Sequence, residues 1–134
     1  MITHVLDTNA FIALVGTKSE KLVRRFTLKP LGAVAVPSVV AHELYYGAMR
    51  SQRVAYNLET LRLAMANIAI LEFDANDALI SGQVRAALAA LGTPIGPYDV
   101  LIAGQAKARR ISVVTNNVRE FGRVAELNVE DWTT

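Results

Sequence analysis

Short apolar segments alternate with longer amphipathic segments along the whole chain. The apolar segments at residues 2–6, 33–36, 68–71 and 111–114 have the length and composition of buried strands, and a short fifth strand is expected near Asn128 and Val129. Between them, apolar residues at helical spacing predict helices at residues 10–15, 19–28, 39–49, 53–66, 74–91 and 97–109. Strands that alternate with helices predict an α/β fold with a small, mostly parallel sheet of four to five strands, flanked by helices.

Local signals refine the ends and faces of these helices. Asp7 or Thr8 is expected to cap the first helix, and Ser38 is a candidate N-cap of helix 39–49. Pro97 is expected in the first turn of helix 97–109, where its missing N–H costs nothing. In helix 74–91, the side chains predicted to face inward are Ala78, Leu79, Val84 and Leu88.

Length and composition favour one domain over residues 1–134. The chain is 52% hydrophobic, which is enough apolar material for a core. It has no cysteine, which excludes disulfides and thiolate metal sites and fits a cytoplasmic protein. No apolar run approaches the roughly 18 residues of a membrane span. The amino terminus lacks the basic start of a signal peptide, so neither a membrane segment nor export is expected.

Three acidic residues stand out by their positions. Asp7 directly follows the first strand, Glu43 lies on or beside the apolar face of helix 39–49, and Asp99 lies in the first turn of helix 97–109. Each has an ordinary explanation: a helix cap, a boundary glutamate, and an anion stabilised by the helix dipole. In parallel α/β sheets, however, ligands bind at the carboxyl ends of the strands. We therefore expect these acids to meet in one pocket.

Uncharged polar residues flank the same strand ends. Thr8 and Asn9 follow Asp7, and Thr115, Asn116 and Asn117 follow the fourth strand, where they either form an ordinary turn or hold a metal-bound water or a phosphate. Oxygen ligands select hard cations such as Mg²⁺ or Mn²⁺. Such an ion acidifies water and stabilises charge on a phosphate. The pattern thus predicts phosphodiester cleavage, with Asp7, Glu43, Asp99 and Asn117 as the catalytic candidates.

Charge adds a modest argument. The chain has 14 Lys and Arg against 12 Asp and Glu, a net charge of +2. If three acids share one pocket, the remaining surface is more basic than this value suggests, which suits a polyanion such as RNA. An ordinary solvated surface explains the same numbers.

Three segments carry a family resemblance: VLDTNAFIAL, PSVVAHELYYGA and TPIGPYDVLIAGQAKARRISVVTNNVREFGRVAELNVEDW. With these segments in this order, the chain resembles PIN-domain proteins, most closely the VapC-type toxins of bacterial toxin–antitoxin pairs. The resemblance implies a Mg²⁺- or Mn²⁺-dependent endoribonuclease that cleaves structured RNA, often tRNA. It also implies a homodimer and a cognate antitoxin, with which the toxin forms a heterotetramer or larger assembly.

The resemblance also assigns residues. Asp7, Glu43 and Asp99 match the family's acidic positions, and Thr115 matches a hydroxyl position. Asn117 falls where many PIN domains have a fourth acid, which argues against a tightly held second metal. Tyr98 stands where related toxins often have Asn, a difference that bears on substrate access.

The antitoxin has a candidate surface. The helices at residues 11–15 and 39–49 have more apolar residues than one buried stripe requires, including Tyr45, Tyr46 and Met49. An amphipathic partner helix could lie between them and direct a basic side chain at the acids. Packing within the protein's own core or a homodimer contact would explain the same residues.

Other readings remain open. A phosphoacceptor signalling domain or an aspartate phosphatase would need paired acids near the first strand, and Asp7-Thr8-Asn9 has only one. A PIN-fold nuclease that is not a toxin, or that acts on DNA, remains an alternative. So does a PIN-fold protein that binds RNA or a partner without cutting it, although all three principal acids are present.

Overall fold

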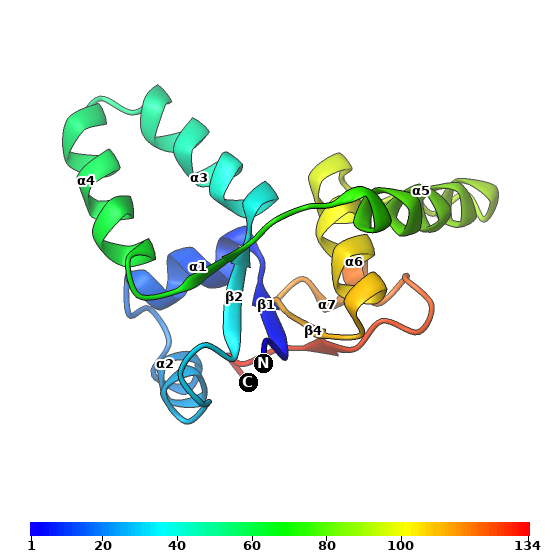
Figure 1. Ribbon diagram of the computed structural model, residues 1–134, viewed down its shortest axis with the longest axis horizontal. Coiled ribbons are helices and arrows are strands. Elements are labelled where there is room, and N and C mark those ends of the chain that lie inside the picture. Colours follow the sequence, from blue (N-terminus) through cyan, green and yellow to red (C-terminus); the bar gives the residue numbers. More distant parts are fainter.

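The computed structural model describes all residues, 1–134, and consists of five strands and seven helices (Figure 1). The strands are β1 (His4–Leu6), β2 (Val34–Pro37), β3 (Ala69–Leu71), β4 (Ser112–Val114) and β5 (Val129–Glu130). The helices are α1 (Thr8–Val15), α2 (Glu20–Thr27), α3 (Ser38–Arg50), α4 (Val54–Met65), α5 (Ala75–Ala90), α6 (Pro97–Arg109) and α7 (Val118–Phe121). The predicted α/β architecture is confirmed.

The five strands form one sheet in the order β3-β2-β1-β4-β5, and every neighbouring pair is parallel. All residues of β1, β2 and β4 are buried, as expected for a parallel sheet covered on both faces. The carboxyl ends of β1 and β2 lead directly into α1 and α3, so these helices begin at the same edge of the sheet (Figure 1). No helix is long and apolar enough to cross a membrane.

Two local expectations were wrong or incomplete. Ser38 is the first residue of α3 and makes no cap, because Pro37 occupies the N-cap position. The sequence pattern also missed α7, which is only four residues long and too short to show a period. Asp7, by contrast, caps α1 as expected, since its side chain accepts a hydrogen bond from the Ala10 N–H.

The inward face of α5 also differs from the prediction. Ala78 and Leu79 are exposed, and the buried positions of the helix are Asp77, Ser81, Val84 and Leu88. Because Asp77 and Ser81 are polar, the pattern of hydrophobic residues does not reveal this buried face. Asp77 is buried because α6 supplies its partners: Gln105 Nε2 lies at 3.1 Å and Arg109 NH2 at 2.9 Å from its Oδ2.

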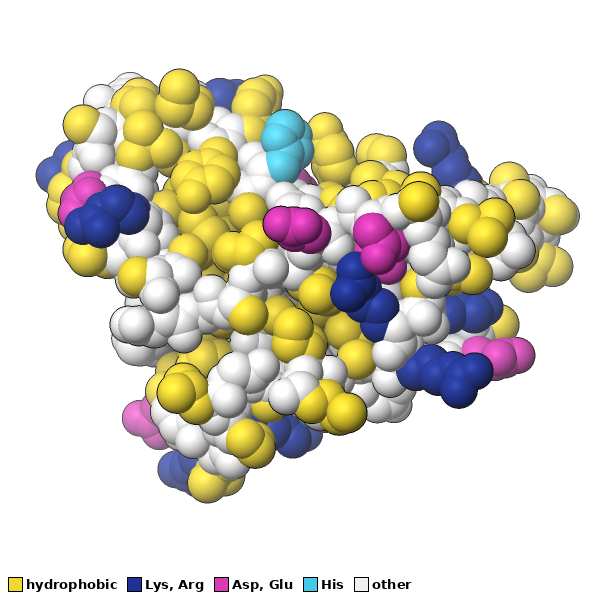
Figure 2. All heavy atoms as spheres, in the orientation of Figure 1, with side chains coloured by type: hydrophobic (Ala, Val, Ile, Leu, Met, Phe, Trp, Pro, Cys, Tyr) yellow, Lys and Arg dark blue, Asp and Glu magenta, His cyan; other side chains and the backbone are white.

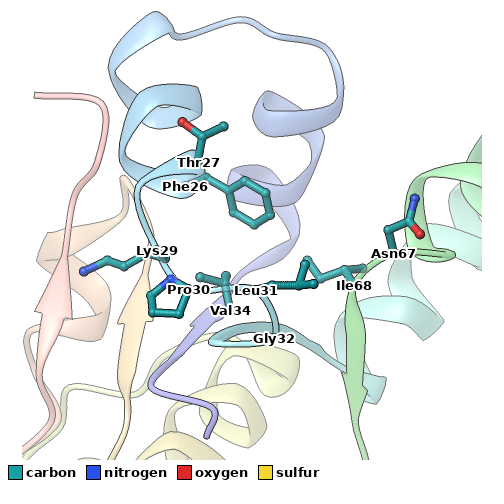
Figure 3. A pocket seen from close by; sticks show the side chains of 9 residues that line it. All are labelled: Phe26, Thr27, Lys29, Pro30, Leu31, Gly32, Val34, Asn67 and Ile68. Carbon is teal, nitrogen blue, oxygen red and sulfur yellow. The ribbon is translucent and has the colours of Figure 1, made fainter.

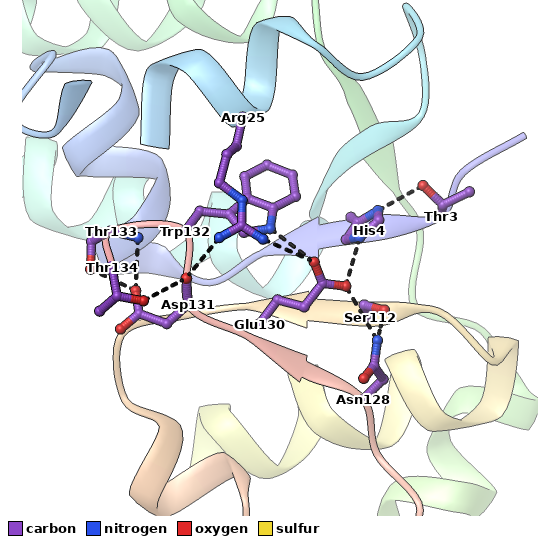
Figure 4. Close-up of polar contacts among 10 residues, drawn as sticks. All are labelled: Thr3, His4, Arg25, Ser112, Asn128, Glu130, Asp131, Trp132, Thr133 and Thr134. Carbon is purple, nitrogen blue, oxygen red and sulfur yellow. Dashed lines mark hydrogen bonds and ion pairs between the residues drawn. The ribbon is translucent and has the colours of Figure 1, made fainter. Parts of the chain in front are cut away.

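A polar cluster joins the two ends of the chain (Figure 4). Glu130 in β5 accepts hydrogen bonds from Trp132 Nε1 at 3.0 Å and pairs with His4 Nε2 of β1 at 2.9 Å. Trp132 is fully buried, and the guanidinium of Arg25 lies 5.7 Å from its ring centroid. The carboxyl-terminal residues are thereby fastened to the first strand of the sheet.

This cluster predicts an acid-sensitive contribution to stability. Partial burial alone would raise the pKa of Glu130, but hydrogen bonds from Trp132 and His4 outweigh it and lower that pKa. Stabilisation by the carboxylate is therefore present at neutral pH and is lost as the pH falls through the lowered value. Glu130→Gln should reduce the melting temperature at pH 7, and the deficit should shrink below about pH 4.

Glu126→Gln, a change at an exposed carboxylate without a hydrogen-bonding partner, is the matched control and should have little effect. Thermal unfolding followed by circular dichroism across this pH range measures both variants. An equal deficit for Glu130→Gln at every pH would show that the carboxylate's charge has no part in holding the carboxyl terminus.

Candidate active site

Asp7 is the most firmly positioned acid of the site. It directly follows β1 and is only 5% exposed. Its Oδ1 accepts a hydrogen bond from the Ala10 N–H at 2.8 Å, and its Oδ2 accepts one from Thr115 Oγ1 at 2.5 Å. Because Thr115 follows β4 and β4 pairs with β1, the sheet itself brings the hydroxyl to the carboxylate. Two donors thus fix this anion in one orientation.

Glu43 and Asp99 come from helices that begin at the same edge. Glu43 is on α3, where its Oε1 accepts a hydrogen bond from Thr8 Oγ1 at 2.9 Å. Asp99 lies in the first turn of α6. The charges of Asp7 and Glu43 both raise the pKa of Asp99, so the three predicted acids lie within electrostatic reach of one another.

Glu120, on α7, is a fourth acid that sequence reasoning missed. It lies close enough to Asp99 to raise the pKa of that residue, and its Oε1 accepts a hydrogen bond from the Gly96 N–H at 2.6 Å. A Cβ atom on Gly96 would lie 3.2 Å from Asp99 Oδ2 and 3.4 Å from Glu120 Oε1. Both carboxylates therefore converge on a backbone position where a side chain would crowd them.

Asn117, a predicted catalytic residue, contacts the fourth acid and Thr115. Its side-chain Nδ2 donates to Glu120 Oε2 at 2.8 Å, and its backbone N–H donates to Thr115 Oγ1 at 2.9 Å. The amide thus orients the fourth acid, which lies three residues further on. This i, i+3 spacing was visible in the sequence, but it becomes informative only once α7 is known to be helical.

The remaining predicted residues divide into two groups. Thr8 and Thr115 each donate to one of the acids, as described above. Asn9 and Asn116 are exposed, form no hydrogen bond with the carboxylates, and border a small hollow with Asp131. Their side chains are free to meet a substrate.

The acids shift one another's protonation in the metal-free protein. Burial, the contact with Glu120 and the charges of the other acids raise the pKa of Asp99 to about 7. Burial and the charge of Glu43 also raise the pKa of Asp7, even though its hydrogen bonds oppose the shift. The pKa of Glu120 is lowered, chiefly by the Gly96 N–H. Asp99 and Glu120 therefore titrate as a coupled pair that retains a proton near neutrality.

The donor chemistry of this site fits a hard divalent cation. All candidate ligands are oxygen atoms, and the excess negative charge makes a cation favourable. No three Asp, Glu or His side chains are already arranged as a ligand set. The fit consequently rests on the type and charge of the donors.

Another hollow lies near the amino ends of β2 and β3, away from the acids (Figure 3). Its volume is about 400 Å³, and residues from the end of α2, the turn before β2 and the start of β3 line it. Lys29 is its one charged lining residue, and no carboxylate or histidine faces it. It has none of the carboxylates that gather at the carboxyl ends of the strands.

Comparison with known proteins identifies the family. The PIN domain model matches residues 4–127. The chain belongs to the PIN-domain family. It is 42% identical to the tRNA(fMet)-specific endonuclease VapC of Shigella flexneri, over 99% of this chain and 100% of the relative.

Two solved structures support the same placement. The DNA-bound VapBC of Salmonella typhimurium superposes with a TM-score of 0.92 at 40% identity, covering 98% of this chain and 99% of that one. The VapBC-1 of nontypeable Haemophilus influenzae gives a TM-score of 0.91 at 30% identity, covering all of both chains. The chain is thus a PIN-domain ribonuclease of the VapC toxin type, as its sequence resemblance implied. Ribonucleases of this type generally depend on a divalent metal ion.

The protonation of Asp99 predicts a pH-dependent stability. Since the folded-state pKa of about 7 lies above the unfolded value of about 3.9, the metal-free protein is stabilised at low pH and loses that stability as the pH rises through 7. Asp99→Asn removes the group that has to ionise. In buffer with a chelator, the variant should melt at a higher temperature than the wild type at pH 8.5, and the advantage should be much smaller at pH 5.

Glu72→Gln alters an exposed carboxylate that is not one of the four acids of this site, and it serves as the control. It should leave the melting temperature nearly unchanged at both pH values. If Asp99→Asn gave the same melting-temperature difference at pH 5 and pH 8.5, the repulsion inferred among the four acids would be wrong.

Proposed function

We propose that this ribonuclease hydrolyses a phosphodiester bond of a structured RNA, with Mg²⁺ or Mn²⁺ held by Asp7, Glu43, Asp99 and Glu120. The observation that carries the proposal is the convergence of these four acids at the carboxyl edge of the sheet. Burial, the contact with Glu120 and the charges of the other acids raise the pKa of Asp99 to about 7, so the site holds a proton near neutral pH. A divalent cation would offset the repulsion among these negative charges, so the site is suited to bind one.

A tRNA is the first substrate to test. The Shigella flexneri relative is named as a tRNA(fMet)-specific endonuclease, and the likeness extends over the whole chain. The basic residues outside the acidic pocket provide the attraction for such a polyanion, and ten of the fourteen are arginines. The enzyme would act in the cytoplasm, where tRNA is found.

Each residue of the site has a definite part in this proposal. Asp7 is a fixed anion, because Ala10 and Thr115 hold both of its oxygens. Asn117 and Gly96 position Glu120, and Glu120 in turn sets the protonation of Asp99. Glu43 is held by Thr8. A bound divalent ion would supply an acidified water and the positive charge that offsets charge developing on the phosphate.

The cleavage proposal predicts four inactive variants. Asp7→Asn, Glu43→Gln, Asp99→Asn and Glu120→Gln each remove one charged ligand while retaining its shape, and each should reduce tRNA cleavage by about a hundredfold or more. A chelator should abolish wild-type activity, and Mg²⁺ or Mn²⁺ should restore it. Gel analysis of tRNA(fMet) fragments measures both effects.

Glu59→Gln provides the matched control, since Glu59 is an exposed carboxylate on α4 paired with Arg62. It should cleave like the wild type. Full activity of folded Asp7→Asn and Asp99→Asn proteins would exclude these acids from catalysis, and cleavage resistant to the chelator would remove the metal from the proposal.

We further propose that a cognate antitoxin occupies the groove between α1, α3 and α4. The groove has a volume of about 360 Å³, with Ile12, Leu44 and Leu61 among its lining residues. Thr8 and Glu43 also line it, so it opens directly onto the candidate active site. An amphipathic helix of the antitoxin fits such a groove, and a basic side chain from it could neutralise the acids in place of the metal.

Exposed apolar residues extend this surface. Tyr46 and Met49 on α3 are 57% and 62% exposed, and hydrophobic side chains gather over the α3–α4 region (Figure 2). Their exposure agrees with the prediction that α3 has more apolar residues than the protein's own core uses. We propose that the toxin is also a homodimer, which would combine with antitoxin chains into a heterotetramer or larger complex.

The antitoxin proposal predicts a stable, inactive complex. When the chain is expressed together with the product of an adjacent antitoxin gene, the two should copurify, and the complex should not cleave tRNA. Met49→Glu and Tyr46→Glu should weaken the complex by about tenfold or more while leaving the melting temperature of the toxin nearly unchanged, since both side chains are exposed.

Leu91→Glu, at an exposed apolar residue just after α5 and far from the groove in sequence, is the control and should bind normally. Isothermal titration calorimetry with the purified antitoxin measures the affinities. Unimpaired binding by both α3 variants would place the antitoxin elsewhere, and a fully active complex would refute inhibition through this groove.

A further inference from the structure

Two aromatic rings meet beside the acidic pocket. His42 on α3 and Tyr98 on α6 lie with their ring centroids 5.6 Å apart and their planes inclined at 51°. His42 immediately precedes Glu43, and Tyr98 immediately precedes Asp99. The two helices that bring these acids to the site therefore also bring the two rings together at its rim.

Both rings are available to a ligand. Tyr98 is 44% exposed, His42 is also exposed, and neither side chain forms a hydrogen bond within the protein. Two other exposed tyrosines are covered by a cation: the guanidinium of Arg53 lies 4.1 Å from the ring centroid of Tyr56, and that of Arg50 lies 5.4 Å from the ring centroid of Tyr46. The pair of His42 and Tyr98, here called the aromatic rim, has no such cover.

By charge alone, the acidic site next to the aromatic rim repels RNA. Asp7, Glu43, Asp99 and Glu120 repel the phosphates that have to approach them, and no Lys or Arg is hydrogen-bonded to any of these four carboxylates. Stacking of a base on an aromatic ring needs no charge and tolerates any base. An aromatic surface at this position can therefore hold a base of the strand without relying on charge.

We propose that the aromatic rim stacks on an unpaired nucleobase adjacent to the scissile phosphate. The inference rests on the proposed function, because it assumes that the bond is cut at the neighbouring acids. It narrows the substrate class, since a base inside a helix has both faces covered by its neighbours. The enzyme should cut where a loop or bulge presents at least one unstacked nucleotide, and should spare the same sequence in a duplex.

A purely structural part for the two rings makes a different prediction. If they only tie α3 to α6, their loss would displace Glu43 and Asp99 and reduce kcat, whatever the RNA. If they stack on a base, their loss should raise KM and should matter only when the base is present. The experiment must therefore vary the ring and the base together.

The first measurement detects stacking without cleavage. Stem–loop RNAs with 2-aminopurine at single loop positions are titrated, in chelator, with the full-length Asp7→Asn protein. At one or more positions the fluorescence should be quenched on binding, and Tyr98→Leu or His42→Ala added to this protein should abolish most of the quenching. Tyr98→Phe, which keeps the ring, should retain it, as should the control Tyr56→Leu on α4.

The second measurement uses cleavage of a tRNA(fMet) transcript. Tyr98→Leu should raise KM about tenfold with kcat changed less than twofold, consistent with the loss of one stacked base. Replacing the nucleotide next to the mapped cleavage position by an abasic one should cost a similar factor. The two changes together should cost little more than either alone, because they remove the same contact.

The outcomes separate the two proposals. If the wild type cleaves RNA but the losses in the double-change cycle are additive, base stacking on the aromatic rim is refuted and the nuclease function stands. Unaltered quenching in Tyr98→Leu and His42→Ala would have the same consequence. A fall in kcat alone, equal for intact and abasic RNA, would also overturn base stacking in favour of a structural role. If the wild type cut no RNA while ring-dependent quenching persisted, the proposed function would fail and the base-binding site would remain.

Discussion

Repulsion among four carboxylates is the constraint around which this end of the molecule is organised. Burial raises the pKa of Asp7 and Asp99, and the charges of the neighbouring acids raise both further. The protein offsets this cost with directed donors: a threonine for Asp7, another for Glu43, and a backbone N–H with an asparagine amide for Glu120. Negative charge is thus concentrated where it can bind a cation close to a phosphate, and the hydrogen-bond donors keep the acids in place.

The rigidity that this arrangement needs comes from contacts outside the pocket. Asp99 is on α6, and α6 is tied to α5 by the ion pair between Arg109 and the buried Asp77. Burial would raise the pKa of Asp77, but hydrogen bonds from Arg109, Asp74 and Gln105 outweigh it and keep the carboxylate ionised. Removing one member of such a pair leaves a buried charge without a partner. The position of Asp99 therefore depends on an ion pair at the other end of its helix.

Much of this protein was legible in its sequence. Apolar segments of the right length predicted the central strands, and the polar residues at their ends marked the carboxyl ends of the strands as the candidate site. The placement of Asp7 as a cap followed from the abrupt change from Leu6 to Asp-Thr-Asn, because capping is a local interaction between neighbouring residues. The family could be inferred as well, because three segments of the chain contain its motifs in the characteristic order and spacing. The inward face of α5 was mispredicted because a local hydrophobic pattern cannot show that the polar residues Asp77 and Ser81 are buried against another helix.

The sequence by itself determined the α/β pattern, the strand ends and the three acids that lie at or near them. Only the tertiary structure decided that Glu120 joins Asp99, that Asn117 orients Glu120, and that His42 meets Tyr98. These contacts join segments separated by tens of residues or depend on a one-turn helix without a detectable period. The long-range contacts among them follow from the strand order β3-β2-β1-β4-β5, which places β4 beside β1, and from the packing of α3 against α6. Hydrophobic patterning states which residues are buried, but the order in which the strands pair is set by packing of the whole chain.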